Sequence, residues 1–466
     1  MPGSLSRFPW RLAASSGLLA VMAVVPTAAS AGVVSVGPVY WVAPGGMPAG
    51  ADTSCQTAAY STVQSAVTAA EATEAQPPGL VPKVEVCPGT YPEQVTILAS
   101  LVLTAAGSGP VTIQLPAAVG SGQSTGLSTT NCQARDAEKD AQVPQSVIEI
   151  CAAGFAGTNI AGVTVAIRGI TVAGPWTSTG CYGRRYGILV GGDATLSLTN
   201  STVEKIEADP LNDCQGGIGV QVGYAPTGQM GHASLTGDTI ESYQKNGITV
   251  DGPGSTAAIN RVVVTGAGPT PVIVQNGIQF SYGATGSVTA STITGDNFTG
   301  KNRASAAGIL AFGGGGTKCG LGATSSLSPL VEHASFTGNR LTGDDMGIAL
   351  ANYDPTCAKS PATATGDLVC RNLIENSHGY GGGVASADAN ISGYSATGPV
   401  GYQAGISDIG NHDVICDNTI SGTGYAPLGS TSSQPAARAF VRPIDVVSGP
   451  AIAPLVYGNL YGGSPY

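Results

Sequence analysis

Apolar residues recur along the middle of the chain at a nearly fixed spacing, marked by a Gly-Ile pair that appears seven times. Successive pairs are separated by 30, 30, 30, 31, 39 and 58 residues. Apolar and polar positions alternate after several of these pairs, as in Ile248, Thr249 and Val250, which is typical of a strand. A repeat of this length predicts a solenoid whose units bury their apolar faces by stacking. The pairs begin at Gly187, Gly217, Gly247, Gly277, Gly308, Gly347 and Gly405.

A second strand family ends in an aliphatic residue that follows a small polar residue by two positions. Asn and Asp favour tight turns because their side chains bond nearby backbone groups and tolerate a left-handed conformation. If the coils stack in register, the equivalent side chains form a ladder along the solenoid. The polar positions are Asp238, Ser291, Asn339, Asn372 and Asn418.

Residues 60–74 have the pattern of a helix. Val63, Ala66, Val67 and Ala70 make an apolar stripe at helical spacing, Ser61 or Thr62 can cap the start, and two prolines at 77–78 prevent continuation. We expect this helix to cover the open first coil and so to block edge-to-edge aggregation.

Composition favours strands over helices in the repeats. Gly accounts for 68 of 466 residues and only 10% of residues are charged, which suits β-coils better than solvent-exposed helices. A net charge of −10 argues against nucleic acid as a partner and, at long range, against acidic polymers.

The first residues have the features of a secretory signal. Arg7 and Arg11 precede a short apolar run at 18–25, and Ala29-Ser30-Ala31 matches the small-residue cleavage pattern. We therefore expect a signal peptide at 1–31, an N-terminal segment with the capping helix at 32–80, a β-helix at 81–424 and a Pro/Ser-rich C-terminal wrap at 425–466. The mature protein is expected to be secreted, soluble, monomeric and without membrane insertion.

All ten cysteines follow the predicted cleavage point, and an even number in an oxidising compartment favours disulfides. Spacing from the Gly-Ile pairs places Cys181 near Cys214 and Cys319 near Cys357. Cys370 and Cys416 each lie two residues before an Asn of the second strand family, which suggests that they form a third pair. The remaining four are expected to pair as sequence neighbours, Cys55–Cys87 and Cys132–Cys151.

Two segments resemble the opening of pectin lyase-like proteins, including pectinesterases: residues 60–67, YSTVQSAV, and 84–97, VEVCPGTYPEQVTI. The resemblance implies an all-β fold, a single-stranded right-handed parallel β-helix with three parallel sheets, and polysaccharide handled in a groove along one sheet. Pectinesterase catalytic motifs are missing. Gly343-Asp-Asp-Met-Gly-Ile-Ala-Leu350 and Ser377-His-Gly-Tyr380 resemble paired polygalacturonase motifs, but that family's other motifs are missing too.

This resemblance makes Asp344, Asp345 and His378 candidate catalytic residues. Two carboxylates facing a groove push their pKa values apart and can divide acid and base roles. They could equally bind calcium, which acidic-sugar lyases of this fold often need. The alternative is that the Asp pair decorates a solvated turn and that His378 is a loop residue.

A polar row is expected on the surface, two residues before each repeated Gly. Long hydrogen-bonding side chains beside aromatic rings suit a sugar chain, so we expect substrate contacts from Arg185, Gln215, Lys245, Gln275, Tyr282 and Tyr353. Any parallel solenoid also presents polar columns to water. The row itself comprises Arg185, Gln215, Lys245, Gln275, Ala306, Asp345 and Gln403, and the aromatic residues are Tyr224, Tyr282, Phe312 and Tyr353.

Three function classes follow. The chain is a secreted β-helix that engages extracellular polysaccharide or cell-surface glycan and cleaves it as a lyase or glycoside hydrolase, a module that binds glycan without cutting it, or a structural or adhesive surface protein. The sequence leaves catalysis undecided, and calcium is the one candidate cofactor.

Overall fold

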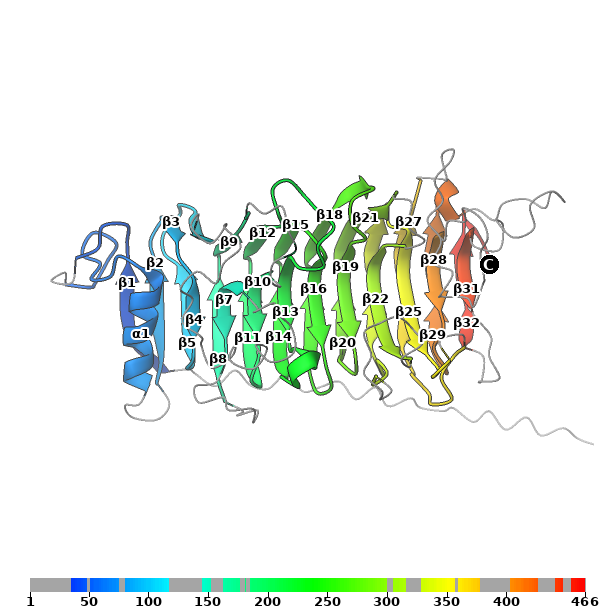
Figure 1. The fold of residues 1–466 in the computed structure, drawn as a ribbon, viewed down its shortest axis with the longest axis horizontal. Coiled ribbons are helices and arrows are strands. Elements are labelled where there is room, and N and C mark those ends of the chain that lie inside the picture. The colour runs from blue at the N-terminus through cyan, green and yellow to red at the C-terminus, as the bar shows by residue number, and fades with distance from the viewer. Residues whose placement is uncertain are drawn as a thin grey trace, which may run out of the picture.

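The protein forms one elongated solenoid whose strands lie side by side along its axis (Figure 1). This computed structural model describes residues 35–47, 51–74, 80–116, 145–151, 162–176, 181, 185–299, 305–315, 328–356, 359–377, 403–425, 441–446 and 454–465. Within these residues, each turn of the chain contributes strands in turn to three sheets, here called sheets A, B and C. Strands adjacent in a sheet are parallel, apart from the last pair of sheet B.

Sheet A contains β1 (Ser35–Val42), β2 (Leu80–Val86), β5 (Leu101–Ala105), β8 (Thr164–Arg168), β11 (Ala194–Thr199), β14 (Gly231–Thr236), β17 (Thr256–Asn260), β20 (Thr285–Thr289), β23 (Ser335–Thr337), β26 (Leu368–Cys370), β29 (Val414–Cys416) and β32 (Leu455–Tyr457). Sheet B contains β3 (Gly89–Pro92), β6 (Val111–Gln114), β9 (Thr171–Ala173), β12 (Thr202–Ile206), β15 (Thr239–Tyr243), β18 (Val263–Thr270), β21 (Thr292–Phe298), β24 (Arg340–Thr342), β27 (Leu373–Glu375), β30 (Thr419–Ser421), β33 (Leu460–Tyr461) and β34 (Ser464–Pro465).

Sheet C contains β4 (Val95–Ile97), β7 (Gln145–Ile150), β10 (Arg185–Val190), β13 (Ile218–Val222), β16 (Asn246–Asp251), β19 (Asn276–Ser281), β22 (Ala307–Gly314), β25 (Met346–Tyr353), β28 (Gln403–Asp408) and β31 (Val441–Val446). The described helices are α1 (Val63–Glu74) and the short 3-10 turns η3 (Ala225–Thr227) and η5 (Thr423–Tyr425). The expected right-handed β-helix with three parallel sheets and an N-terminal helix is confirmed.

The repeated Gly-Ile pairs all fall on sheet C, and six of the seven are in register. Ile248 pairs with Ile278, and the same column continues through Ile309, Ile348 and Ile406. The exception is the second pair: Ile218 lies beside Tyr186, and Val220 lies beside Ile188. The true counterpart of the other pairs in this coil is therefore Gly219-Val220, two residues further along.

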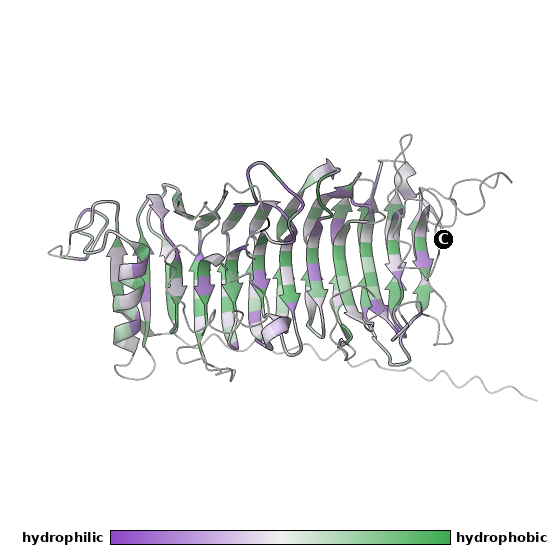
Figure 2. Cartoon of the chain, in the orientation of Figure 1, coloured by the Kyte–Doolittle hydropathy of each residue, from purple (hydrophilic) through white to green (hydrophobic). Residues whose placement is uncertain are grey.

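Glycine is required at the first position of these pairs, because the backbone there lies close to the next coil of sheet C and to a side chain of sheet B. A Cβ on Gly247 would lie 2.6 Å from the carbonyl oxygen of Gly277 and 2.7 Å from a methyl carbon of Val264 in sheet B. The next residue in each coil points into the core, where Ile248 and Ile278 are fully buried. Apolar bands cross successive strands along the solenoid (Figure 2).

The predicted ladder lies at the turn from sheet A to sheet B. Asn372 Oδ1 accepts hydrogen bonds from the backbone and side-chain nitrogens of Asn339, at 2.9 and 3.0 Å. Asn418 accepts from Asn372, and Asn459 accepts from Asn418, in the same way. The left-handed residue is the one before each ladder position, such as Arg371 with φ 60°. The Asn at each ladder position therefore does not adopt the left-handed conformation itself, and its side chain bonds the adjacent coil.

Helix α1 covers the first coil as expected. Val63, Ala66, Val67 and Ala70 are fully buried. Its polar side chains satisfy the edge of β4: Gln64 Oε1 accepts from the Thr96 nitrogen at 2.6 Å, and a Glu71 carboxylate oxygen accepts from the Leu98 nitrogen at 2.6 Å. The helix begins at Val63 and not at residue 60, because Tyr60 forms a bridge with Val42 of β1.

The start of α1 is capped by Thr62, whose Oγ1 accepts from the Ser65 nitrogen at 3.2 Å as expected, and also by Glu93 from outside the helix. The Glu93 carboxylate accepts from the backbone nitrogens of Val63 and Gln64 at 2.7 and 2.9 Å. We expect Glu93→Ala to lower the free energy of unfolding by about 1–2 kcal/mol, since both donors lose their partner. Urea titration measures this. Glu241→Ala, on the outer face of β15, is the control, and an equal effect of both changes would contradict the capping role.

The C-terminal strands extend the solenoid beyond the expected boundary. β31, β32 and β33 continue sheets C, A and B respectively. The expectation that residues 425–466 wrap around the end is therefore wrong for these strands, because their parallel pairing adds them to the sheets. β1 likewise already belongs to sheet A, ahead of the expected start of the β-helix. The proposed signal peptide lies outside the described residues.

Three of the predicted disulfides are confirmed. Cys55–Cys87, Cys181–Cys214 and Cys370–Cys416 are bonded, with Cα atoms 5.6, 5.0 and 4.6 Å apart. Cys132, Cys319 and Cys357 lie outside the described residues, so the pairs Cys132–Cys151 and Cys319–Cys357 stay predictions. Among the described helices, none combines the length and apolar character needed to cross a membrane.

Candidate functional site

The predicted catalytic carboxylates lie inside the protein. Asp344 and Asp345 fall between β24 and β25 and are 0% and 1% exposed. Asp345 accepts hydrogen bonds from the backbone nitrogens of Phe298 and Ala306, at 2.9 and 3.0 Å, and from the Asn297 side chain at 2.7 Å. Burial raises the pKa of Asp345 to about 7, and these hydrogen bonds partly oppose the shift.

A third carboxylate, Asp296, joins this buried group. Asp344 Oδ1 accepts from the Asp296 backbone nitrogen at 2.9 Å, and the Tyr243 hydroxyl donates to Asp296 Oδ1 at 2.7 Å. Burial raises the pKa of both aspartates well above the ordinary value, and their mutual repulsion adds to the shift for Asp344. The expectation that the Asp pair faces a surface groove is wrong, and so is that of a solvated turn, because these side chains bond the backbone of neighbouring coils.

His378 lies outside the described residues, and its catalytic role stays a prediction.

Most of the polar row expected on the surface is buried, Gln215 and Lys245 being the exceptions. Arg185 and Gln275 are 3% and 1% exposed. Gln275 accepts from the Ala267 nitrogen at 2.8 Å, and Lys245 Nζ donates to the Val274 carbonyl at 2.7 Å. These side chains lie at the corner between sheets B and C and bond the backbone of neighbouring segments, Gln275 to β18 and Lys245 to Val274. The expectation of a surface row is therefore wrong for the buried members.

Burial also changes the acid–base properties of the two cations in this row. The Arg185 guanidinium lies 4.7 Å from the centroid of the Trp176 ring, and burial lowers its pKa to about 10. Burial likewise lowers the pKa of Lys245 to about 8. Gln215 is exposed but stands outside the column, because the register shift places Gly217 there.

The outer face of sheet C instead carries a different polar group, which we call the amide seam: Gln221, Asn246, Thr249, Asn276 and Gln279. The Asn246 amide nitrogen donates to Thr249 Oγ1 at 2.9 Å and lies 3.1 Å from Gln279 Oε1. The Asn276 amide nitrogen donates to Asn246 Oδ1 at 3.2 Å. Gln279 is partly exposed and the other four are buried. These hydrogen bonds join β16 and β19. Gln221 on β13 lies beside Thr249 in register, and its amide nitrogen donates to the Gly223 carbonyl at 2.8 Å.

Three aromatic rings form a column where sheet C turns toward sheet A. The rings of Tyr282 and Phe312 have centroids 5.6 Å apart, and those of Phe312 and Tyr353 are 6.4 Å apart, both edge to face. Tyr282 and Phe312 are partly exposed, and Tyr353 is 7% exposed. We call this set the aromatic column. Tyr224, the fourth expected ring, lies two coils earlier, just before η3.

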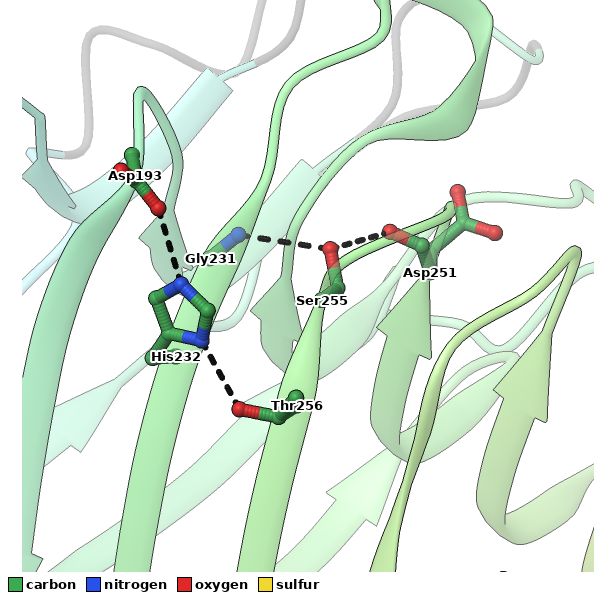
Figure 3. Close-up of polar contacts among 6 residues, drawn as sticks. All are labelled: Asp193, Gly231, His232, Asp251, Ser255 and Thr256. Carbon is green, nitrogen blue, oxygen red and sulfur yellow. Dashed lines mark hydrogen bonds and ion pairs between the residues drawn. The ribbon is translucent and has the colours of Figure 1, made fainter. Parts of the chain in front are cut away.

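A third constellation, which the sequence patterns did not reveal, lies on the outer face of sheet A (Figure 3). His232 Nε2 lies 2.8 Å from Asp193 Oδ1, and His232 Nδ1 lies 2.8 Å from Thr256 Oγ1. These residues come from three successive coils. Aligning the strands of sheet A would have placed His232 beside Thr256, whereas Asp193 belongs to the preceding turn and carries no periodic signal.

Among the described residues, one cluster has the ligand types of a metal site: Cys181, Asp213 and Cys214. Its two cysteines are bonded to each other, so their sulfurs are not thiolate ligands. A calcium requirement stays a prediction.

Comparisons show similarity to solved structures at the level of the fold. The chain resembles XylC in complex with xylose (11% identity, TM-score 0.46, 82% of this chain and 69% of that one). It also resembles the Dettilon tailspike protein (14%, 0.42, 86% and 63%) and pectate lyase Pel9A (14%, 0.35, 72% and 87%). No family model and no curated protein matches the chain. The three sheets of stacked parallel strands match the β-helix architecture that the resemblance to pectin lyase-like proteins implied.

Proposed function

We propose that this is an extracellular protein that binds polysaccharide along the outer face of sheet C. The observation that carries the proposal is the aromatic column beside the amide seam. Both sets lie on sheet C or at its edge, and β19 contributes to each, through Gln279 and through Tyr282 directly after the strand. Sugar rings present apolar C–H faces and hydroxyl edges, so the partly exposed rings of Tyr282 and Phe312 and the partly exposed amide of Gln279 match both.

The accessible part of the outer face is limited to the region of the aromatic column. Beyond the amide seam, Ala307, Met346, Ala349 and Ala404 form a cluster that is only 0–3% exposed, so these residues do not contact a ligand from solution. Three disulfides support an oxidising, extracellular location.

Binding without cleavage is favoured over cleavage because the carboxylates expected to cut the chain are inside the protein. Asp344 and Asp345 are committed to backbone hydrogen bonds between coils. A structural or adhesive role is the second candidate, and it is compatible with the same surface.

The aromatic column gives a direct test. A panel of plant and microbial polysaccharides is first screened for binding to the mature protein, with and without calcium. For a glycan that binds, we expect Tyr282→Ala and Tyr353→Ala each to weaken affinity by about 2- to 10-fold. Calorimetry measures the change. Tyr457→Ala on β32, where the ring is 49% exposed, is the matched control.

Wild-type affinity in the Tyr282/Tyr353 double variant would refute the column as a binding surface. Unsaturated products from any polysaccharide in the panel would instead identify a lyase, and saturated reducing-end products would identify a hydrolase. Dependence on calcium would add weight to a lyase.

A further inference from the structure

The Asp193, His232 and Thr256 side chains form a continuous hydrogen-bonded relay on the outer face of sheet A. His232 lies on β14, and Thr256 is the first residue of β17, directly beside it in register. The next residues, Ala233 and Ala257, point into the core, so the two side chains point outward. The side chains of His232 and Asp193 are 32% and 16% exposed. The relay is therefore accessible to a molecule from solution.

The charge of Asp193 sets the direction of the hydrogen bonds. A carboxylate can only accept, so His232 Nε2 carries the proton that is donated to Asp193 Oδ1. In the neutral ring, Nδ1 is then the acceptor, and Thr256 Oγ1 donates to it. This is the arrangement in which a base accepts the proton of a hydroxyl while a third group fixes its tautomer.

The backbone holds the three residues in place. Asp193 has a left-handed conformation, φ 64°, and its nitrogen donates to the Met230 carbonyl at 2.8 Å, two residues before His232. Ser255 Oγ accepts from the Gly231 nitrogen at 3.3 Å and donates to the Asp251 carbonyl at 2.8 Å (Figure 3). Ser255 directly precedes Thr256 and Gly231 directly precedes His232, so this hydrogen bond holds the two strands together beside the relay. A site fixed by strands and adjacent turns is well suited to catalysis, because little reorganisation is needed.

We propose that this relay is a nucleophilic acyl-transfer site, in which Thr256 is the nucleophile, His232 the general base and Asp193 the residue that orients it. This activity goes beyond polysaccharide binding, and it uses a different face of the protein. The substrate class is a carboxylic ester, because the Thr256 hydroxyl lies on the outer face of sheet A, where a carbonyl carbon from solution can reach it.

The chemistry balances without any further reagent. Thr256 Oγ attacks the ester carbonyl carbon as its proton passes to His232 Nδ1, and the Oγ–C bond forms. The bond from carbon to the alcohol oxygen then breaks, and His232 returns the proton to the departing alcohol. Water attacks the acyl-threonine, with His232 accepting its proton. The carboxylic acid leaves and Thr256 Oγ regains the proton.

The experiment uses the mature protein with p-nitrophenyl acetate. We expect release of p-nitrophenolate, and a mass increase of one acetyl group on the peptide that contains Thr256 after a rapid acid quench. Thr256→Val abolishes the adduct, and Thr256→Ser retains it. His232→Gln lowers the rate by about 100-fold or more. Asp193→Asn also lowers it by about 100-fold or more, because an amide no longer fixes the tautomer.

The matched control is Thr195→Val. Thr195 lies beside His232 in register on β11, on the opposite side from Thr256, and is partly exposed like it. We expect wild-type rates in this variant. Circular dichroism and thermal melting confirm that each variant is folded. No hydrolysis by the wild-type protein, an adduct on another residue, or full activity in Thr256→Val would each overturn the proposal. None of these results bears on glycan binding at sheet C.

Discussion

Replacing Asn372 by alanine will lower the free energy of unfolding by at least about 3 kcal/mol, because the change leaves several buried polar groups without partners. Its Oδ1 accepts from both nitrogens of Asn339, and its Nδ2 donates to the Phe336 carbonyl and to Asn418 Oδ1. Asn339, Asn372 and Asn418 are at most 1% exposed, so water cannot replace the lost hydrogen bonds. Urea unfolding followed by circular dichroism measures the loss.

Asn260→Ala is the control for that prediction. Asn260 lies on β17 and donates one hydrogen bond, to a partly exposed threonine hydroxyl at 2.7 Å. We expect a change of less than about 1 kcal/mol there. Equal losses at the two positions would show that the ladder adds nothing beyond an ordinary surface hydrogen bond.

The free energy of unfolding will fall as the pH rises from about 4 to about 7. Asp345 has a pKa of about 7 in the folded protein and an ordinary value of 3.8. The folded state therefore holds this proton more tightly than the unfolded chain. The resulting stabilisation is complete below the ordinary value and is lost as the pH passes the folded value, amounting to about 4 kcal/mol. Asp238, raised by burial to a pKa of about 6, acts in the same direction.

Denaturant titrations across this range test the prediction, and Asp345→Asn should flatten the dependence because an amide does not ionise. A stability that stays level or rises between about pH 4 and pH 7 would contradict the raised pKa. The window ends there because Lys245 has the opposite effect. Its pKa is lowered to about 8, so its contribution to stability grows at higher pH.

The architecture could be predicted from the sequence because the repeated Gly-Ile pairs reflect contacts between adjacent coils. Gly247 and Gly277 recur since any side chain would strike the next coil. The same pattern was in error by two residues at Gly217. A shift of two keeps the alternation of inward and outward residues, and both Gly217-Ile218 and Gly219-Val220 fit the motif.

The candidate site was less predictable. The direction of side chains at the turn between sheets B and C depends on the segments around that turn, and the spacing of the Gly-Ile pairs gives no information on them. Two residues before each Gly, the chain is still at the corner of sheets B and C, so Gln275 bonds the backbone of β15 and β18. Asp296 was missed since its partner Asp344 lies 48 residues away in the chain. The relay around His232 depends on a turn residue, Asp193, with no counterpart in other coils.

The two ends of the solenoid differ, and the difference has a consequence for how the chain acquires its structure. Helix α1 closes the end that the ribosome makes first, where Gln64 and Glu71 occupy the edge of β4. At the other end, Leu455, Val456 and Tyr457 are 60%, 37% and 49% exposed. The capped end is therefore synthesised first, and each later coil has a completed neighbour on its N-terminal side only. We expect the coils to fold one after another in the direction of synthesis.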